Sequence, residues 1–129
     1  MNLKDPTLLR TDSYVNGAWT AAPGERRFAV TNPATGETVA EVADLGAAET
    51  TAAIDAAVPA QKAWAACTAK DRAMVMRKWY ELVMANAEDL AVILTTEMGK
   101  PIAEARGEIA YGASFIDWFA EEARRICGD

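Results

Sequence analysis

The residues of this 129-residue chain that could carry out chemistry are two cysteines and a scatter of carboxylates. Cys67 and Cys127 are the only thiols, and the absence of histidine removes the commonest base that activates a nucleophile. Cys67 lies just before an expected helix, whose N-terminus could favour a thiolate, yet we expect both cysteines to be structural. Two cysteines so far apart also fit no disulfide framework and no zinc motif, which indicates a reducing, cytoplasmic setting.

The carboxylates Glu104 and Glu108 are four residues apart on one expected helix, as in an acid/base pair or a metal site. A solvated face is the commoner explanation, because Lys100 and Arg106 are close by in the sequence. An exposed helix end similarly explains the charged residues at 121–125. The glycines form neither a GxGxxG nor a Walker pattern. The residues alone therefore define no complete catalytic site.

Composition excludes several classes of protein. The net charge is −6, and no cluster of Lys and Arg offers a surface for nucleic acid. No apolar run reaches the roughly 20 residues that cross a bilayer. Residues 1–6 lack the layout of a signal peptide. The hydrophobic content of 51% suits one domain with a modest core.

The last third of the chain carries the strongest structural signal. Gly99 suits the end of one helix and Pro101 the beginning of the next. An apolar stripe then continues at three- and four-residue spacing through Ile102, Ala105, Ile109, Gly112, Ile116, Phe119, Ala123 and Ile126. Tyr111, Phe115 and Trp118 fall on a second face. A helix that is apolar on two faces needs cover on both, so we expect this chain to be a piece of something larger.

The preceding residues divide into an arm (1–12), a β-element (13–43) and a helical region (44–129). Asn16-Gly17 predicts a hairpin turn, residues 26–31 and 37–42 predict two further strands, and the turn signal at 32–36 separates them. We expect four helices, and therefore an α+β fold for the chain taken by itself. In the first helix we expect Ile54, Val58, Trp64 and Ala65 to lie on the buried side, and Pro59 to cause a kink. The second helix should start at Thr68-Ala69-Lys70-Asp71 and carry its apolar stripe at Met76, Trp79 and Val83. The third should be capped by Asn86 with Asp89 and point Leu90, Ile93 and Leu94 inward.

Several segments in order resemble the aldehyde dehydrogenase superfamily. They are Val15-Asn16-Gly17-Ala18-Trp19, residues 30–37 (VTNPATGE), Glu97-Met98-Gly99-Lys100-Pro101, residues 104–109 (EARGEI) and residues 113–123 (ASFIDWFAEEA). The last two are most similar to the succinate-semialdehyde dehydrogenase branch. The resemblance covers nearly the whole chain and implies the N-terminal part of the family's Rossmann-like α/β cofactor-binding domain.

What the resemblance implies is oxidation of an aldehyde to a carboxylate with NAD or NADP. Succinate semialdehyde, from γ-aminobutyrate breakdown, is the implied substrate, and a homo-oligomer is the implied assembly. The family's catalytic cysteine and glutamate and its main nucleotide-binding residues correspond to positions downstream of this segment. No catalytic or cofactor-binding role therefore passes to Cys67, Cys127 or any other residue here, and we do not expect the segment alone to bind the cofactor well.

The resemblance does transfer two roles. It implies that oxygens at Thr31 and Glu97 help to hold a monovalent cation. It also implies that Tyr111 and Phe115 line the substrate tunnel, although packing against a missing domain explains both aromatic residues equally well. Two alternatives to an enzyme fragment stay open. One is a non-catalytic helical interaction module, and the other is one half of a split dehydrogenase.

Overall fold

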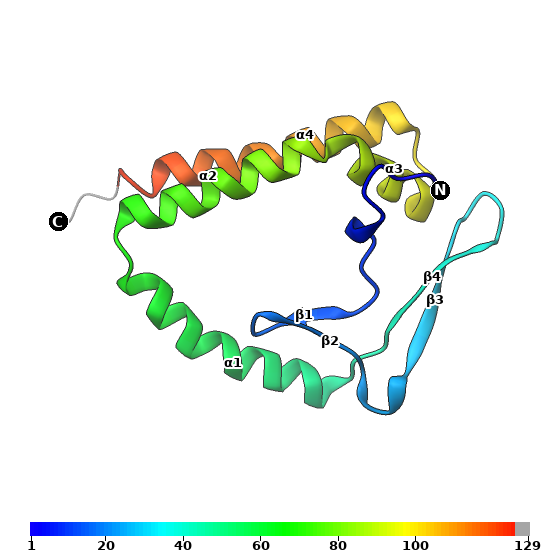
Figure 1. The fold of residues 1–129 in the computed structure, drawn as a ribbon, viewed down its shortest axis with the longest axis horizontal. Coiled ribbons are helices and arrows are strands. Elements are labelled where there is room, and N and C mark those ends of the chain that lie inside the picture. The colour runs from blue at the N-terminus through cyan, green and yellow to red at the C-terminus, as the bar shows by residue number, and fades with distance from the viewer. Residues whose placement is uncertain (126–129) are drawn as a thin grey trace.

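The computed structural model describes residues 1–125, and Ile126 and Cys127 lie outside the described residues. Short strands are followed by four helices, as the α+β prediction requires (Figure 1). The elements are a 3-10 turn Pro6–Leu8, β1 Ser13–Val15, β2 Ala18–Thr20, a 3-10 turn Pro23–Glu25, β3 Arg27–Thr31, β4 Thr38–Ala43, α1 Ala47–Ala66, α2 Ala69–Ala85, α3 Ala87–Met98 and α4 Ile102–Glu122.

The strands form two separate antiparallel ribbons, β1–β2 and β3–β4, rather than one small sheet. Asn16 (φ 48°) and Gly17 (φ 83°) both take the positive φ that a type I′ hairpin needs, as the Asn-Gly pair predicts. In the turn between β3 and β4, the Asn32 side-chain oxygen accepts the amide of Ala34 at 2.9 Å. Local turn chemistry therefore fixes both ribbons.

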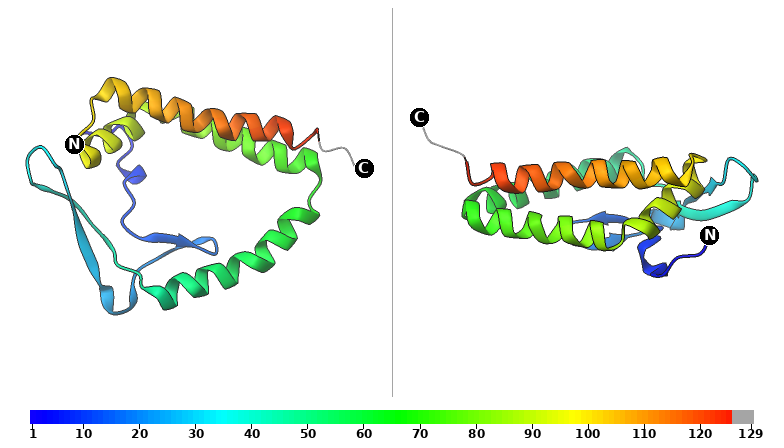
Figure 2. Two further views of the ribbon diagram at one scale, coloured as in Figure 1. Left: turned by 180° about the vertical axis from the view of Figure 1, so that it is seen from behind. Right: turned by 90° about the horizontal axis from the view of Figure 1, so that it is seen from above.

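The helices α2 and α4 run antiparallel and side by side, with α3 packed at one end (Figures 1 and 2). The buried residues of this helical layer are mostly alanines, because small side chains let the helix backbones approach closely. They are Ala73, Ala91, Ala105, Ala113 and Ala120. The Thr68 hydroxyl accepts the Asp71 amide at 3.1 Å, so the predicted start of α2 is confirmed.

The predicted stripe on α4 is partly wrong. Ala105 is buried, but Gly112 and Phe119 are exposed, and Ala113 and Ala120 take the buried positions instead. The line that faces α2 and α3 is shifted by one residue along the second half of α4. Pro101 is the residue before the helix rather than its first residue, and Gly99 ends α3 with φ +79° as predicted.

α1 is continuous across Pro59, so this proline does not interrupt the helix. None of its residues is buried, and Ile54 and Val58, predicted to face inward, are 61% and 51% exposed. Trp64 is half-buried and Ala65 is exposed. The reason is that α1 packs extensively against no other described element.

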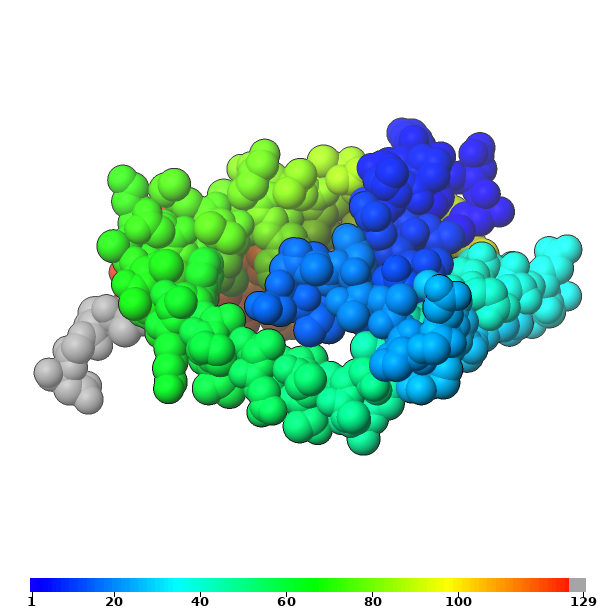
Figure 3. Space-filling model, turned by 60° about the horizontal axis from the view of Figure 1, so that its bottom comes forward, coloured from blue at the N-terminus to red at the C-terminus, as the bar shows by residue number. Residues whose placement is uncertain are grey.

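The chain traces an open ring, with the helical layer along one side, α1 along the opposite side, and the β3–β4 ribbon running between the start of α1 and the α3 end of the layer (Figure 1). Viewed from another side, the N-terminal arm and β1–β2 lie between α1 and the helical layer (Figure 3). Across residues 1–125, the structure contains no helix with the length and apolarity needed to cross a membrane.

Candidate functional site

The aromatic ridge of α4 consists of Tyr111, Phe115, Trp118 and Phe119. The rings of Tyr111 and Phe115 meet edge to face, with centroids 4.9 Å apart and planes at 82°. Their four-residue spacing places them on one helix face, where they are 66% and 47% exposed. Phe115, Trp118 and Phe119 line a shallow hollow of about 450 Å³ with Ser114. The ridge can therefore offer an apolar wall to a ligand or to another domain.

Ion pairs between helices hold α4 in place. Arg77 of α2 contacts Asp117 at 2.5 Å and Glu121 at 2.8 Å, and its hydrogen bond to Glu121 raises the pKa of the guanidinium. Arg106 binds both carboxylate oxygens of Glu88 in α3, at 2.6 and 2.8 Å. That hydrogen-bonded pairing lowers the pKa of Glu88.

The carboxylate pair on α4 belongs to this pattern of charged surface contacts. Glu108 pairs with Lys100, as the solvated-face explanation expects. Arg106 turns instead toward Glu88 on the neighbouring helix. Within residues 1–125 no group of three or more His, Cys, Asp or Glu side chains could hold a metal ion.

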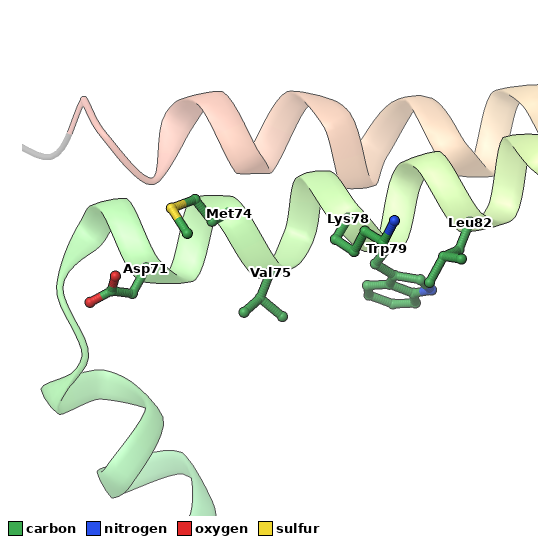
Figure 4. A pocket seen from close by; sticks show the side chains of 6 residues that line it. All are labelled: Asp71, Met74, Val75, Lys78, Trp79 and Leu82. Carbon is green, nitrogen blue, oxygen red and sulfur yellow. The ribbon is translucent and has the colours of Figure 1, made fainter.

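A second apolar face lies on α2. Val75, Trp79 and Leu82 project to the same side of the helix, toward the side on which α1 continues (Figure 4). With Asp71, Met74 and Lys78 they line a groove of about 580 Å³. Periodicity predicts that Trp79 is buried with Met76 and Val83. It is instead 58% exposed, because no described element covers this side of α2, whereas Met76 and Val83 are half-buried.

Thr31 and Glu97 are far apart in the sequence but lie in neighbouring regions of the fold. Thr31 ends β3 opposite Thr38, and Glu97 lies in the last turn of α3. The residues beside them, Asn32 and Thr96, line one hollow of about 260 Å³ with Met1, Glu37, Thr38 and Val39. The hollow thus gathers amide, hydroxyl and carboxylate oxygens, which are the ligands that hard cations prefer. Both Thr31 and Glu97 are exposed.

The helix N-termini of the described residues are close to acidic side chains. A helix N-terminus is a common site for a phosphate, but at α1 the Gly46 amide already donates to the Glu49 carboxylate at 2.7 Å. The first turns of the other three helices also carry acidic residues. Cys67 is exposed at the end of α1, where its thiol contacts the Ala63 carbonyl at 3.5 Å.

Asp89 is the residue that sequence reasoning misplaces. The sequence predicts that it caps α3 with Asn86. Asn86 is the N-cap residue of α3 as predicted, but its side chain donates to the Leu82 carbonyl and makes no capping hydrogen bond to α3. Asp89 is only 5% exposed and accepts the backbone amides of Lys4 at 3.0 Å and Asp5 at 2.8 Å. The partners are 84 and 85 residues away, so no local pattern could reveal them.

Residues 19–129 match the aldehyde dehydrogenase family, and the chain belongs to this family. Over all 129 residues it is 56% identical to a glutarate-semialdehyde dehydrogenase of Pseudomonas putida and 52% identical to the succinate-semialdehyde dehydrogenase [NADP(+)] of Escherichia coli. The chain spans 27% of the length of each of these relatives.

A solved structure has the same fold over the whole chain. The crystal structure of succinate-semialdehyde dehydrogenase from Burkholderia pseudomallei matches the whole chain with a TM-score of 0.95 and 56% identity, and the chain covers 27% of it. The described elements are therefore those of the N-terminal part of the aldehyde dehydrogenase fold.

Proposed function

We propose that this chain is the N-terminal part of an NAD(P)-dependent aldehyde dehydrogenase that oxidises succinate semialdehyde to succinate, as in γ-aminobutyrate breakdown. The observation that carries the proposal is the identity of 50% or more, over the whole chain, to several semialdehyde dehydrogenases. The relatives named for glutarate and succinate semialdehydes suggest a short aldehyde that ends in a carboxylate. The nicotinamide cofactor would accept the hydride, and residues outside this segment would hold it.

Within that enzyme, the role of this segment is to support the site and to form part of its wall. Tyr111 and Phe115 are exposed, meet edge to face and are carried by a helix that ion pairs fix at both ends. We assign them to the wall of the substrate tunnel. An apolar wall suits the methylene chain of a semialdehyde, and its rigid ring pair would orient the aldehyde for attack.

We also assign Thr31 and Glu97 to a monovalent cation site, which the gathering of oxygen atoms around the adjoining hollow supports. A cytoplasmic location and a homo-oligomeric assembly complete the proposal. The small number of cysteines supports the location.

The test is a dehydrogenase assay on the enzyme that contains this segment, with succinate and glutarate semialdehydes and either nicotinamide cofactor. Tyr111→Leu and Phe115→Leu should raise KM for the aldehyde by about tenfold, because each removes apolar contact area from the wall. Phe28→Leu is the matched control, since Phe28 is an exposed aromatic residue on β3. Glu97→Gln should abolish any response of thermal stability to potassium.

Absence of reduction of either cofactor by any semialdehyde would overturn the proposed function. Equal KM values for the α4 variants and the control would remove only the tunnel assignment. A potassium response that persists in Glu97→Gln would remove only the cation assignment.

A further inference from the structure

The N-terminal arm, residues 1–12, is hydrogen-bonded to the rest of the molecule at two points, and the Arg10 guanidinium also lies over the Trp19 ring of β2, 5.0 Å from its centroid. One is the Asp89 carboxylate at the start of α3, which accepts two successive amides of the arm. The other is the β3–β4 ribbon, where the Thr11 carbonyl accepts the Ala43 amide at 2.8 Å and Asp12 pairs with Arg27 at 2.7 Å. The arm therefore joins the helical layer to the end of the ribbon that is remote from its turn, whereas the turn itself meets the end of α3, where Pro33 lies against Gly99 (Figure 1).

We propose that Asp89 is a positioning residue whose carboxylate holds the arm through the Lys4 and Asp5 amides, a contact that we call the latch. Together with the contact of Pro33 and Gly99 at the ribbon's turn, the latch fixes the other end of the ribbon relative to the helical layer. A carboxylate with 5% exposure needs hydrogen-bond donors, since burial of an unpaired charge is costly. The two arm amides supply them, and charge-assisted bonds of this kind are stronger than neutral ones. The positive N-terminal end of α3 favours the negative charge at the same place.

The hydrogen bonds of the Asp5 side chain set the direction in which the arm continues after Asp89 has bound it. The Asp5 carboxylate accepts the amide of Thr7 at 2.9 Å and its hydroxyl at 2.7 Å, which starts the 3-10 turn Pro6–Leu8. These hydrogen bonds lower the pKa of Asp5. Asp5 thus uses its amide to bind Asp89 and its side chain to turn the arm. The turn directs residues 9–12 toward the ribbon.

The latch has a consequence at the other end of α3. Met1 lies on the wall of the hollow that also contains Asn32 and Glu37 of the β3–β4 turn and Thr96 of α3. Because Lys4 and Asp5 are fixed at the beginning of α3, the first three residues can reach this hollow. Release of the latch would free Met1 and remove one wall of it.

The first measurement is hydrogen exchange at the Lys4 and Asp5 amides in the unmodified protein. Both amides should exchange slowly although they lie in a terminal arm, because both are bound to a buried carboxylate. Exchange as fast as in an unstructured peptide would overturn the proposal without the need for any variant.

The second measurement compares Asp89→Asn with Glu121→Gln. The Asn side chain keeps one oxygen but turns an NH₂ group toward the second amide, so exchange at Lys4 and Asp5 and tryptic cleavage after Arg10 should accelerate about tenfold or more. Glu121→Gln is the control, since it weakens an ion pair of the same helical layer, that with Arg77, and leaves the latch intact. Equal acceleration in both variants, or none in Asp89→Asn, would overturn the proposal.

A third variant tests the attachment of the arm to the β3–β4 ribbon separately. Arg27→Gln removes the pair with Asp12 and the contact with the Thr11 carbonyl, and leaves Asp89 untouched. It should accelerate cleavage after Arg10 while Lys4 and Asp5 stay protected. Loss of protection at Lys4 and Asp5 would show that the ribbon, and not Asp89, holds the arm. Because these readouts follow the arm, they are independent of dehydrogenase activity.

Discussion

At the scale of single residues, Gly99 shows how one position can serve two purposes. Its φ of +79° ends α3, and its missing side chain lets Pro33 of the β3–β4 turn approach. A Cβ atom at Gly99 would lie 2.8 Å from the Pro33 Cγ atom, which is closer than real contacts allow. The residue therefore terminates a helix and joins it to the ribbon.

Gly99→Ala should lower the free energy of unfolding by about 1–2 kcal/mol for the left-handed backbone, and further because Pro33 must move. Gly36→Ala is the control, since Gly36 has φ +75° and a Cβ atom added there would meet nothing within 4 Å, so only the backbone cost applies. Urea unfolding of the two variants measures the difference. Equal losses would show that the Pro33 contact contributes nothing.

At the scale of elements, the helical layer depends on small residues between α2, α3 and α4. Ala113 of α4 is 1% exposed. One helical turn further along α4, Asp117 pairs with Arg77 of α2. Large apolar side chains instead lie on the outer faces of the layer. The interface is thus close-packed and has little room for extra atoms.

Ala113→Leu should therefore destabilise the protein by about 1–3 kcal/mol, because the added carbon atoms must separate the helices. Gly107→Ala, on the exposed side of the same helix with nothing within 4 Å, should stabilise it by about 0.5–1 kcal/mol through helix propensity. Thermal unfolding of both variants measures whether each substitution lowers or raises the stability. A stable Ala113→Leu protein would mean that the layer is loosely packed.

At the scale of the whole molecule, the chain has apolar faces on both sides of one thin layer. The aromatic ridge of α4 and the groove on α2 remain open in the described structure, together with Ile54 and Val58 of α1. Exposed apolar surface of this extent marks an interface. The family relatives, of which the chain spans 27%, suggest that the rest of a dehydrogenase would cover it.

The isolated 129-residue chain should consequently bind an apolar fluorescent dye and associate as its concentration rises. Addition of the remaining part of a dehydrogenase should suppress both effects, as a split enzyme also requires. Dye fluorescence and light scattering measure the outcome. A monodisperse chain that binds no dye would favour the helical interaction module.

Local patterns predicted much of the backbone. Asn16-Gly17 indicated the first hairpin, Thr68 with Asp71 the start of α2, and Gly99 the end of α3, because each feature depends on the residue's own conformational preferences and on neighbours within a few positions. The order of the family segments further predicted the aldehyde dehydrogenase family, which the match over residues 19–129 shows.

Burial and long-range partners were decided by the tertiary structure. Periodicity placed Ile54, Trp79 and Phe119 inward, yet a helix face is buried only where another element meets it, and here none of the described elements does. Likewise, the sequence predicted that Asp89, in the first turn of α3, helps to cap that helix. Asp89 instead holds amides 84 and 85 positions away, because hydrogen-bond partners depend on where the fold brings the chain back.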